Sequence, residues 1–301
     1  MKMLITDALT DKKSLYDYFG KKFEIIEIKE NHCEEYEDLF FSDIDVVICN
    51  NLFLYKNISL FKNLKVIHVT SAGLDRLPLK DIKKRKITLF SSRGVYSIPI
   101  AEHVILGILS LYHNVEFFLQ NKNKKIWLKN RIVLELCEKK VGIIGCGSIG
   151  IECARRLQSF GCVVDGFDAD DHKKPNFENV YQMSFLKQKI NEYDILIAAI
   201  PLDETTFHMF DSTFFASMKP QSVFVNVSRG KLVEEESLIE ALKTKLFGAV
   251  LDVFNEEPLD KNSELWDLNN VFLTPHNSFV GENNNNRLTD LIIKNLSEFF
   301  E

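Results

Sequence analysis

The sequence predicts an α/β fold in which two parallel sheets are each covered by helices. Short apolar runs alternate with polar, amphipathic stretches through the first third of the chain, and a second such alternation begins at Val141. Apolar runs of this length between helical segments are typical of parallel strands buried on both faces. A chain of 301 residues with 46% hydrophobic and 27% charged residues also allows two domains, at about 150 residues each, with a core in each.

The first alternation contains five runs rich in apolar and β-branched residues. Its expected strands cover 3–6, 23–28, 45–48, 65–69 and 87–90. A long helical pattern then starts at Pro99, a residue suited to a first helical turn because its missing N–H costs nothing there. We expect this helix to lead into the second domain.

The second alternation contains six expected strands with helical segments between most of them. They cover 141–145, 162–168, 194–200, 222–227, 248–253 and 271–274. Six strands in this order predict a doubly wound sheet, whose ligand crevice lies at the carboxyl ends of the strands. The asparagine run 283–286 is expected to form a cap and loop before an amphipathic helix over 288–300.

Composition excludes several classes of protein. The balance of 43 acidic and 37 basic residues, net −6, gives no electrostatic footprint for nucleic acid. The apolar runs fall short of the ~18 residues of a membrane span, and the N-terminus lacks the apolar core of a signal peptide. We therefore expect a cytoplasmic protein without nucleic-acid or membrane partners. The six cysteines include no C-x-x-C pair, which predicts reduced thiols and no metal site.

A G-x-G-x-x-G motif follows the first strand of the second alternation and opens a helix. Gly145 permits a tight turn, Gly147 lets the backbone approach a pyrophosphate, and Gly150 lets helix and strand pack closely. The free N–H groups of the first helical turn, which includes Ser148 and Ile149, favour an anion. The motif therefore predicts a dinucleotide-binding Rossmann domain.

The next strand ends at Asp168, about 20 residues after the glycines, where an acid accepts hydrogen bonds from the adenosine ribose. A 2′-phosphate would meet Asp168 with Asp170 and Asp171 just behind it. This arrangement favours NAD over NADP as cofactor. The alternative for Asp168 is a turn residue at a strand end.

Three further strand ends carry reactive side chains. Arg229 follows the fourth strand, Glu257 the fifth and His276 the sixth, so all three are expected at one crevice. Hydride transfer between a nicotinamide and an alcohol needs a proton relay, which His supplies. It also needs a fixed cation for the substrate carboxylate, and the fork of Arg suits that better than Lys. A carboxylate beside the imidazole stabilises its protonated form.

With these residues in order, the sequence resembles the D-isomer-specific 2-hydroxyacid dehydrogenase family over essentially its whole length. The matching stretches are 141–150, 218–230, 248–259 and 273–276. The resemblance implies Arg229 as substrate-orienting cation, His276 as general acid/base and Glu257 as partner of the His. Glu257 is preferred to Glu256 because it immediately precedes Pro258.

The resemblance also implies a domain arrangement. A Rossmann domain over 98–276 is inserted in a flavodoxin-like substrate domain made of 1–97 and 277–301. The region 99–130 is expected to form a homodimer, as in members of the family.

Other positions carry over from the family. The backbone of Ser71, Ala72 and Gly73 is expected to hold the substrate carboxylate. The remaining expected cofactor contacts are Pro201, Thr206, Val227 and Asp252, the last at the nicotinamide amide.

Two departures from the family leave the substrate open. Phe279 stands where the family usually has a small glycine-containing segment, and no regulatory domain is expected after His276. Arg93 has two interpretations, contact with a second acidic group and a surface role. We expect NAD-dependent interconversion of a 2-hydroxy acid and a 2-oxo acid, with an NAD(H)-sensing, corepressor-like binding protein as the alternative.

Overall fold

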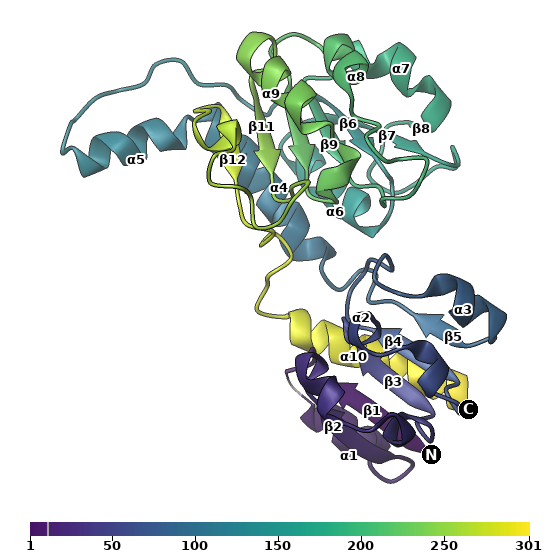
Figure 1. The fold of residues 1–301 in the computed structure, drawn as a ribbon. Coiled ribbons are helices and arrows are strands. Elements are labelled where there is room, and N and C mark those ends of the chain that lie inside the picture. Colours follow the sequence, from purple (N-terminus) through teal and green to yellow (C-terminus); the bar gives the residue numbers. More distant parts are fainter. Residues whose placement is uncertain (11) are drawn as a thin grey trace. The chain divides into compact units, whose positions relative to one another are not determined.

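The computed structural model describes residues 1–10 and 12–301, which form two compact units (Figure 1). Unit 1 comprises Met1–Tyr96 and Gly281–Glu301, and unit 2 comprises Ser97–Val280. Unit 2 is therefore an insertion in the chain of unit 1. The second boundary falls after Val280, where the sequence analysis expected it after His276.

Unit 1 contains a five-stranded, all-parallel sheet with the order β2-β1-β3-β4-β5. Its strands are β1 (Lys2–Thr6), β2 (Glu24–Ile28), β3 (Val46–Cys49), β4 (Val66–Val69) and β5 (Thr88–Phe90). This order is the flavodoxin-like form of the doubly wound sheet. The five runs expected from the sequence are all present as strands, which confirms the predicted fold class for this unit.

The helices of unit 1 cover both faces of this sheet with apolar side chains. They are α1 (Lys13–Phe19), α2 (Leu52–Tyr55), α3 (Leu79–Lys84) and α10 (Asn284–Phe300), with 3-10 turns η1 (Glu30–Glu35), η2 (Asp38–Phe41) and η3 (Ile58–Leu60). Helix α10 packs on α1 and buries Leu288, Ile292 and Leu296, which recur every fourth residue along one face.

The asparagine run was predicted as a cap and loop. Asn283 is the N-cap residue, but the loop was wrong for residues 284–286 because α10 begins at Asn284. Arg287 fixes this first turn, since its Nε donates to the carbonyl of Val95 at 2.8 Å and its Nη2 to Asn284 Oδ1 at 2.7 Å. Tertiary anchoring thus extends the helix into residues of modest helix propensity.

Unit 2 contains a seven-stranded parallel sheet with the order β12-β11-β10-β9-β6-β7-β8. Its strands are β6 (Lys140–Ile144), β7 (Val163–Asp168), β8 (Val180–Gln182), β9 (Ile195–Ala198), β10 (Val223–Asn226), β11 (Gly248–Leu251) and β12 (Val271–Leu273). This is the Rossmann order with one more strand. The sequence analysis missed β8, because three residues paired with Gly166–Asp168 are too few to show a period.

The helices of unit 2 are α4 (Ser97–Tyr112), α5 (Val115–Asn123), α6 (Ser148–Ser159), α7 (Leu186–Lys189), α8 (Ser212–Ser217) and α9 (Glu235–Thr244). Its 3-10 turns are η4 (Met183–Phe185), η5 (Ile190–Glu192), η6 (Gly230–Leu232) and η7 (Glu264–Trp266). Helix α4 packs on α6, β11 and β12. Gly107 allows this approach, because a Cβ there would lie 2.5 Å from Val250 Cγ1.

No single helix among the described residues is long and apolar enough to cross a membrane. Within residues 1–10 and 12–301, one pair of helices, α4 and α5, passes that test of length and composition when taken together, and the pair is bent by 69°.

The core of unit 1 contains one histidine, His68 of β4, which is fully buried. Asn295 Nδ2 lies 3.2 Å from His68 Nε2, and since an amide nitrogen only donates, Nε2 accepts. His68 Nδ1 has no partner among the described residues. Burial lowers the pKa of His68 to about 4, so the ring is neutral in the folded chain at neutral pH.

We predict that His68 makes unit 1 sensitive to acid. Its pKa falls from 6.5 to about 4 on folding, so the unfolded chain binds more protons between these values. The part of the folding free energy that comes from the neutral His68 ring is fully present above pH 6.5 and is lost as pH falls through about 4. His68→Gln, which keeps an acceptor for Asn295, should remove this component from urea unfolding measured across that range. Parallel pH dependences of wild type and variant would contradict the assignment.

Candidate active site

The turn between β6 and α6 has a backbone that only glycine fits. Gly145 has φ of +99°, and a Cβ there would lie 2.5 Å from the carbonyl oxygen of Ala199. A Cβ on Gly150 would lie 2.2 Å from the carbonyl oxygen of Gly145. The glycines therefore set both the tight turn and the close packing of helix on strand.

The N-terminus of α6 is open to an anion. Gly147 precedes the helix, and within the described chain the N–H groups of Ser148 and Ile149 have no hydrogen-bond partner. Such N–H groups at the start of a helix of 12 residues carry partial positive charge. These residues fit the pyrophosphate of a dinucleotide.

Asp168 ends β7 beside this turn. Its Oδ2 accepts hydrogen bonds from Cys146 N at 3.0 Å and Lys174 Nζ at 2.8 Å, and its Oδ1 accepts from Ala169 N at 2.7 Å. Burial opposes ionisation of Asp168, but these donors, Lys174 first, outweigh it and lower its pKa. The sequence analysis missed Lys174, because nothing in the pattern of a loop residue indicates its partner.

The loop after β9 is joined to the loop after β10. Thr206 Oγ1 donates to the carbonyl oxygen of Pro201 at 2.9 Å, and Ser228 Oγ donates to the carbonyl oxygen of Ile200. Val227 is buried at the end of β10. These bonds fix the backbone of the segments that carry Pro201, Thr206 and Val227, whose contacts with a cofactor stay predictions.

Arg229 lies on a turn that the side chain of Asn226 shapes. Asn226 Nδ2 donates to the carbonyl of Arg229 at 2.9 Å, and its Oδ1 accepts from Ser228 N at 3.1 Å. A Cβ on the next residue, Gly230, would lie 1.9 Å from the carbonyl carbon of Phe254. Glycine there lets the Arg229 loop touch the loop that follows β11.

Glu257 and His276 are in direct contact. Glu257 Oε2 lies 2.7 Å from His276 Nδ1, and Glu257 Oε1 accepts from Phe254 N at 3.1 Å. Since Nδ1 faces the carboxylate, Nε2 is the ring nitrogen left to face a ligand. The His276 side chain is 32% exposed, so a ligand can reach it.

His276 has φ of +49°, in the left-handed region, and Asp252 holds the backbone there. The fully buried Asp252 accepts from Thr274 Oγ1 at 2.7 Å and from the N–H groups of Asn277 and Ser278 at 2.8 and 3.0 Å. His276 N donates to the Asp252 carbonyl at 2.8 Å. The sequence analysis placed Asp252 at a nicotinamide amide and missed this positioning role.

Two rings flank the same segment. His103 of α4 has Nε2 at 3.0 Å from Thr274 Oγ1, and burial lowers its pKa although Asp252 opposes the shift. Phe279 packs edge-to-face on His276, with ring centroids 6.0 Å apart. Phe279 is 41% exposed, so it covers one side of the imidazole without enclosing it.

The expected carboxylate loop follows β4 in unit 1. Ser71 Oγ donates to Gly73 O at 2.8 Å, and within the described chain the N–H groups of Ala72 and Gly73 have no acceptor. The buried Ser92 fastens the loop, with its N donating to Ser71 O at 2.9 Å and its Oγ to Val69 O at 2.7 Å. Successive free N–H groups suit a carboxylate.

The nearby Arg93 is exposed. Among residues 1–10 and 12–301, no group of three or more His, Cys, Asp and Glu could hold a metal ion.

The family model described as D-isomer specific 2-hydroxyacid dehydrogenase, NAD binding domain, matches residues 105–278. The chain belongs to this family. A glyoxylate/hydroxypyruvate reductase of Arabidopsis thaliana is 32% identical over 81% of this chain and 77% of its own. A glyoxylate reductase of Korarchaeum cryptofilum is 28% identical over 78% of this chain and 73% of its own.

Solved structures share the fold. A D-isomer specific 2-hydroxyacid dehydrogenase family protein from Aeromonas salmonicida has a TM-score of 0.84 at 25% identity, covering 99% of this chain and 96% of that one. The D-lactate dehydrogenase of Aquifex aeolicus with NAD and lactic acid has a TM-score of 0.82 at 23% identity, covering 99% of this chain and 95% of that one. An NADPH-dependent glyoxylate/hydroxypyruvate reductase of Sinorhizobium meliloti has a TM-score of 0.82 at 22% identity, covering 100% of this chain and 95% of that one.

The family and these relatives support a nicotinamide-dependent oxidoreductase that interconverts 2-hydroxy acids and 2-oxo acids. Both NAD and NADP chemistry occur among proteins of this fold, so the fold itself does not select one cofactor.

We predict that Glu257 holds the ring of His276 in a working orientation. Glu257→Gln keeps the size of the side chain but replaces the carboxylate 2.7 Å from Nδ1 with an amide, so kcat for an active 2-oxo acid should fall by at least about tenfold while the Kd of NADH stays within about twofold. Steady-state rates and titration calorimetry measure the two quantities, and Glu256→Gln is the matched control. If Glu257→Gln keeps the wild-type kcat and Glu256→Gln loses it, Glu256 becomes the candidate partner.

Proposed function

We propose that the chain is an NAD-dependent D-2-hydroxyacid dehydrogenase, with His276 as general acid/base. The observation that carries this proposal is the contact of Glu257 with His276 Nδ1, which leaves Nε2 free on the unit that also holds the Gly145 turn. A dinucleotide site and a proton relay on one sheet are what hydride transfer to a carbonyl requires.

NADH, when bound, supplies the hydride that the carbonyl carbon of the 2-oxo acid receives. His276 gives its Nε2 proton to the carbonyl oxygen, so this oxygen becomes a neutral hydroxyl rather than an alkoxide. Arg229 holds the substrate carboxylate and polarises the carbonyl through its fork of donors. In the oxidation direction His276 takes the hydroxyl proton, and Glu257 stabilises the imidazolium that forms.

Small 2-oxo acids are the first substrates to test, because two of the relatives are named for glyoxylate and hydroxypyruvate. The alternative, an NAD(H)-sensing binding protein of the same fold, needs the turn at Gly145 but no proton relay. The Glu257–His276 contact favours turnover over sensing.

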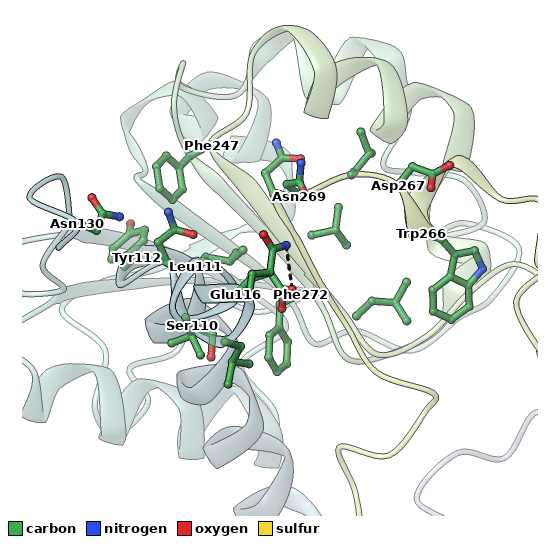
Figure 2. Close-up of a pocket in the computed structure, with 18 of the residues that line it drawn as sticks. Ser110, Leu111, Tyr112, Glu116, Asn130, Phe247, Trp266, Asp267, Asn269 and Phe272 are labelled. Carbon is green, nitrogen blue, oxygen red and sulfur yellow. Dashed lines mark hydrogen bonds between the residues drawn. The ribbon is translucent and has the colours of Figure 1, made fainter. Parts of the chain in front are cut away.

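We further propose a homodimer formed through 99–130. Helix α5 and the segment after it extend away from the seven-stranded sheet (Figure 1), and Phe118 and Trp127 on them are 42% and 95% exposed. Beside α5 lies a groove of about 1090 Å³ (Figure 2). Its lining includes Leu111 of α4, Phe247 just before β11 and Phe272 of β12. Exposed apolar surface of this kind marks an interaction site, and the mass of the protein in solution tests the dimer.

We predict that a panel of 2-oxo acids with NADH gives turnover that depends on Arg229. Arg229→Lys keeps the charge but loses the two-pronged fork, so kcat/KM should fall by orders of magnitude while the Kd of NADH barely changes. The absorbance of NADH follows the reaction, and calorimetry gives the Kd. Turnover of Arg229→Lys within about twofold of wild type would exclude Arg229 as the substrate clamp.

We predict that NADH is preferred over NADPH by at least about tenfold in kcat/KM, equal to ~1.4 kcal/mol. The physical reason is repulsion between a 2′-phosphate and the ionised Asp168 at the end of β7. Asp168→Ala should narrow the preference. Comparable kcat/KM for the two cofactors in the wild type would contradict the assignment.

A further inference from the structure

Lys174 lies beside the acid that is expected to select NAD. Its ammonium is 2.8 Å from Asp168 Oδ2 and 3.7 Å from Asp170 Oδ1. The Lys174 side chain is only 22% exposed, whereas lysines are mostly exposed in folded proteins. The cation is therefore held at the ribose end of the expected cofactor site rather than free in solvent.

The loop that carries Lys174 packs against β7 through the side chain of Phe177. Phe177 is buried, and a Cβ on Gly166 of β7 would lie 3.0 Å from the Phe177 ring. A Cβ there would also lie 2.2 Å from Cys146 Sγ, so glycine at 166 leaves room for both side chains. This packing fastens the loop to the strand that ends in Asp168.

We propose that Lys174 is a specificity-determining residue that sets how strongly the site discriminates between NADH and NADPH. This inference rests on the proposed function, because it concerns the same cofactor site. The acid rejects a 2′-phosphate by charge repulsion, and a cation in contact with that acid cancels much of the repulsion. The three rotatable donors of an ammonium can also pair with a phosphate.

The same lysine acts in the opposite sense on NADH. Lys174 Nζ and Cys146 N share Asp168 Oδ2, while Ala169 N occupies Oδ1. Ribose hydroxyls must therefore compete with Lys174 for the carboxylate. Removal of the ammonium should leave NADH binding unchanged or stronger and should weaken NADPH binding.

The test is the Kd of NADH and of NADPH, each measured by titration calorimetry without substrate. In Lys174→Met the ratio of the NADPH Kd to the NADH Kd should rise by more than about twofold and up to about fivefold, because one partly exposed charge pair contributes up to ~1 kcal/mol. Lys174→Arg, which keeps a cation, should stay within about twofold of wild type. Lys173→Met is the matched control, because it removes the same charge from the exposed neighbouring residue and should not change the ratio.

Salt gives a second readout, since only charge pairing is screened. NADPH binding should weaken with salt more steeply in the wild type than in Lys174→Met. Should Lys174→Met not fold, Lys174→Gln keeps most of the side chain and is expected to give the same ratio.

The inference is overturned if the ratio of the NADPH Kd to the NADH Kd in Lys174→Met or Lys174→Gln stays within about twofold of wild type. It is also overturned if Lys173→Met changes this ratio as much as Lys174→Met does. If the wild type binds NADH and Asp168→Ala changes the Kd of NADH, while the Lys174 variants keep the wild-type ratio of the two Kd values, the inference fails and the proposed function stands. If the wild type binds neither nucleotide, the proposed function fails.

Discussion

The buried carboxylate of Asp252 is the interaction on which the candidate active site depends. It accepts the Thr274 hydroxyl and the N–H groups of Asn277 and Ser278, and its own carbonyl accepts His276 N. These bonds hold His276 at a φ of +49°, which a non-glycine residue adopts only when its surroundings impose it. A buried charge that satisfies several backbone donors is costly to replace, so the position of His276 is fixed before any ligand binds.

The parallel sheet brings the remaining groups of unit 2 to the same edge. Five groups lie at or just after the carboxyl ends of five different strands, namely the Gly145 turn, Asp168, Arg229, Asp252 and His276. Glu257 lies further along the loop after β11. Gly230 then brings the Arg229 loop against the backbone of Phe254, whose N–H also binds Glu257 Oε1. Backbone contact between the two loops thus links the candidate clamp for a carboxylate to the partner of the histidine.

The sequence predicted the five strands of the first sheet and six of the seven strands of the second, because buried parallel strands leave a local signal of short apolar runs. It also predicted the glycine turn, since Gly145 and Gly150 have steric roles that a motif records. The short β8, the ion pair of Lys174 with Asp168 and the positioning role of Asp252 were missed. Each depends on partners brought together by the fold, and no spacing along the chain reveals which carboxylate oxygen a distant N–H will reach. The start of α10 was misjudged for the same reason, because Arg287 anchors it to Val95 far away in sequence.

We propose that His276, oriented by Glu257 and Asp252, moves the proton that accompanies hydride transfer. Single-turnover reduction of an active 2-oxo acid by His276→Ala, with the Kd of NADH measured on the same sample, tests it most directly. We expect the rate of the chemical step to fall by about 10² to 10⁴, the size of a lost general acid, while the Kd of NADH stays within about twofold of wild type. A rate within about tenfold of wild type, at full NADH binding, would contradict it.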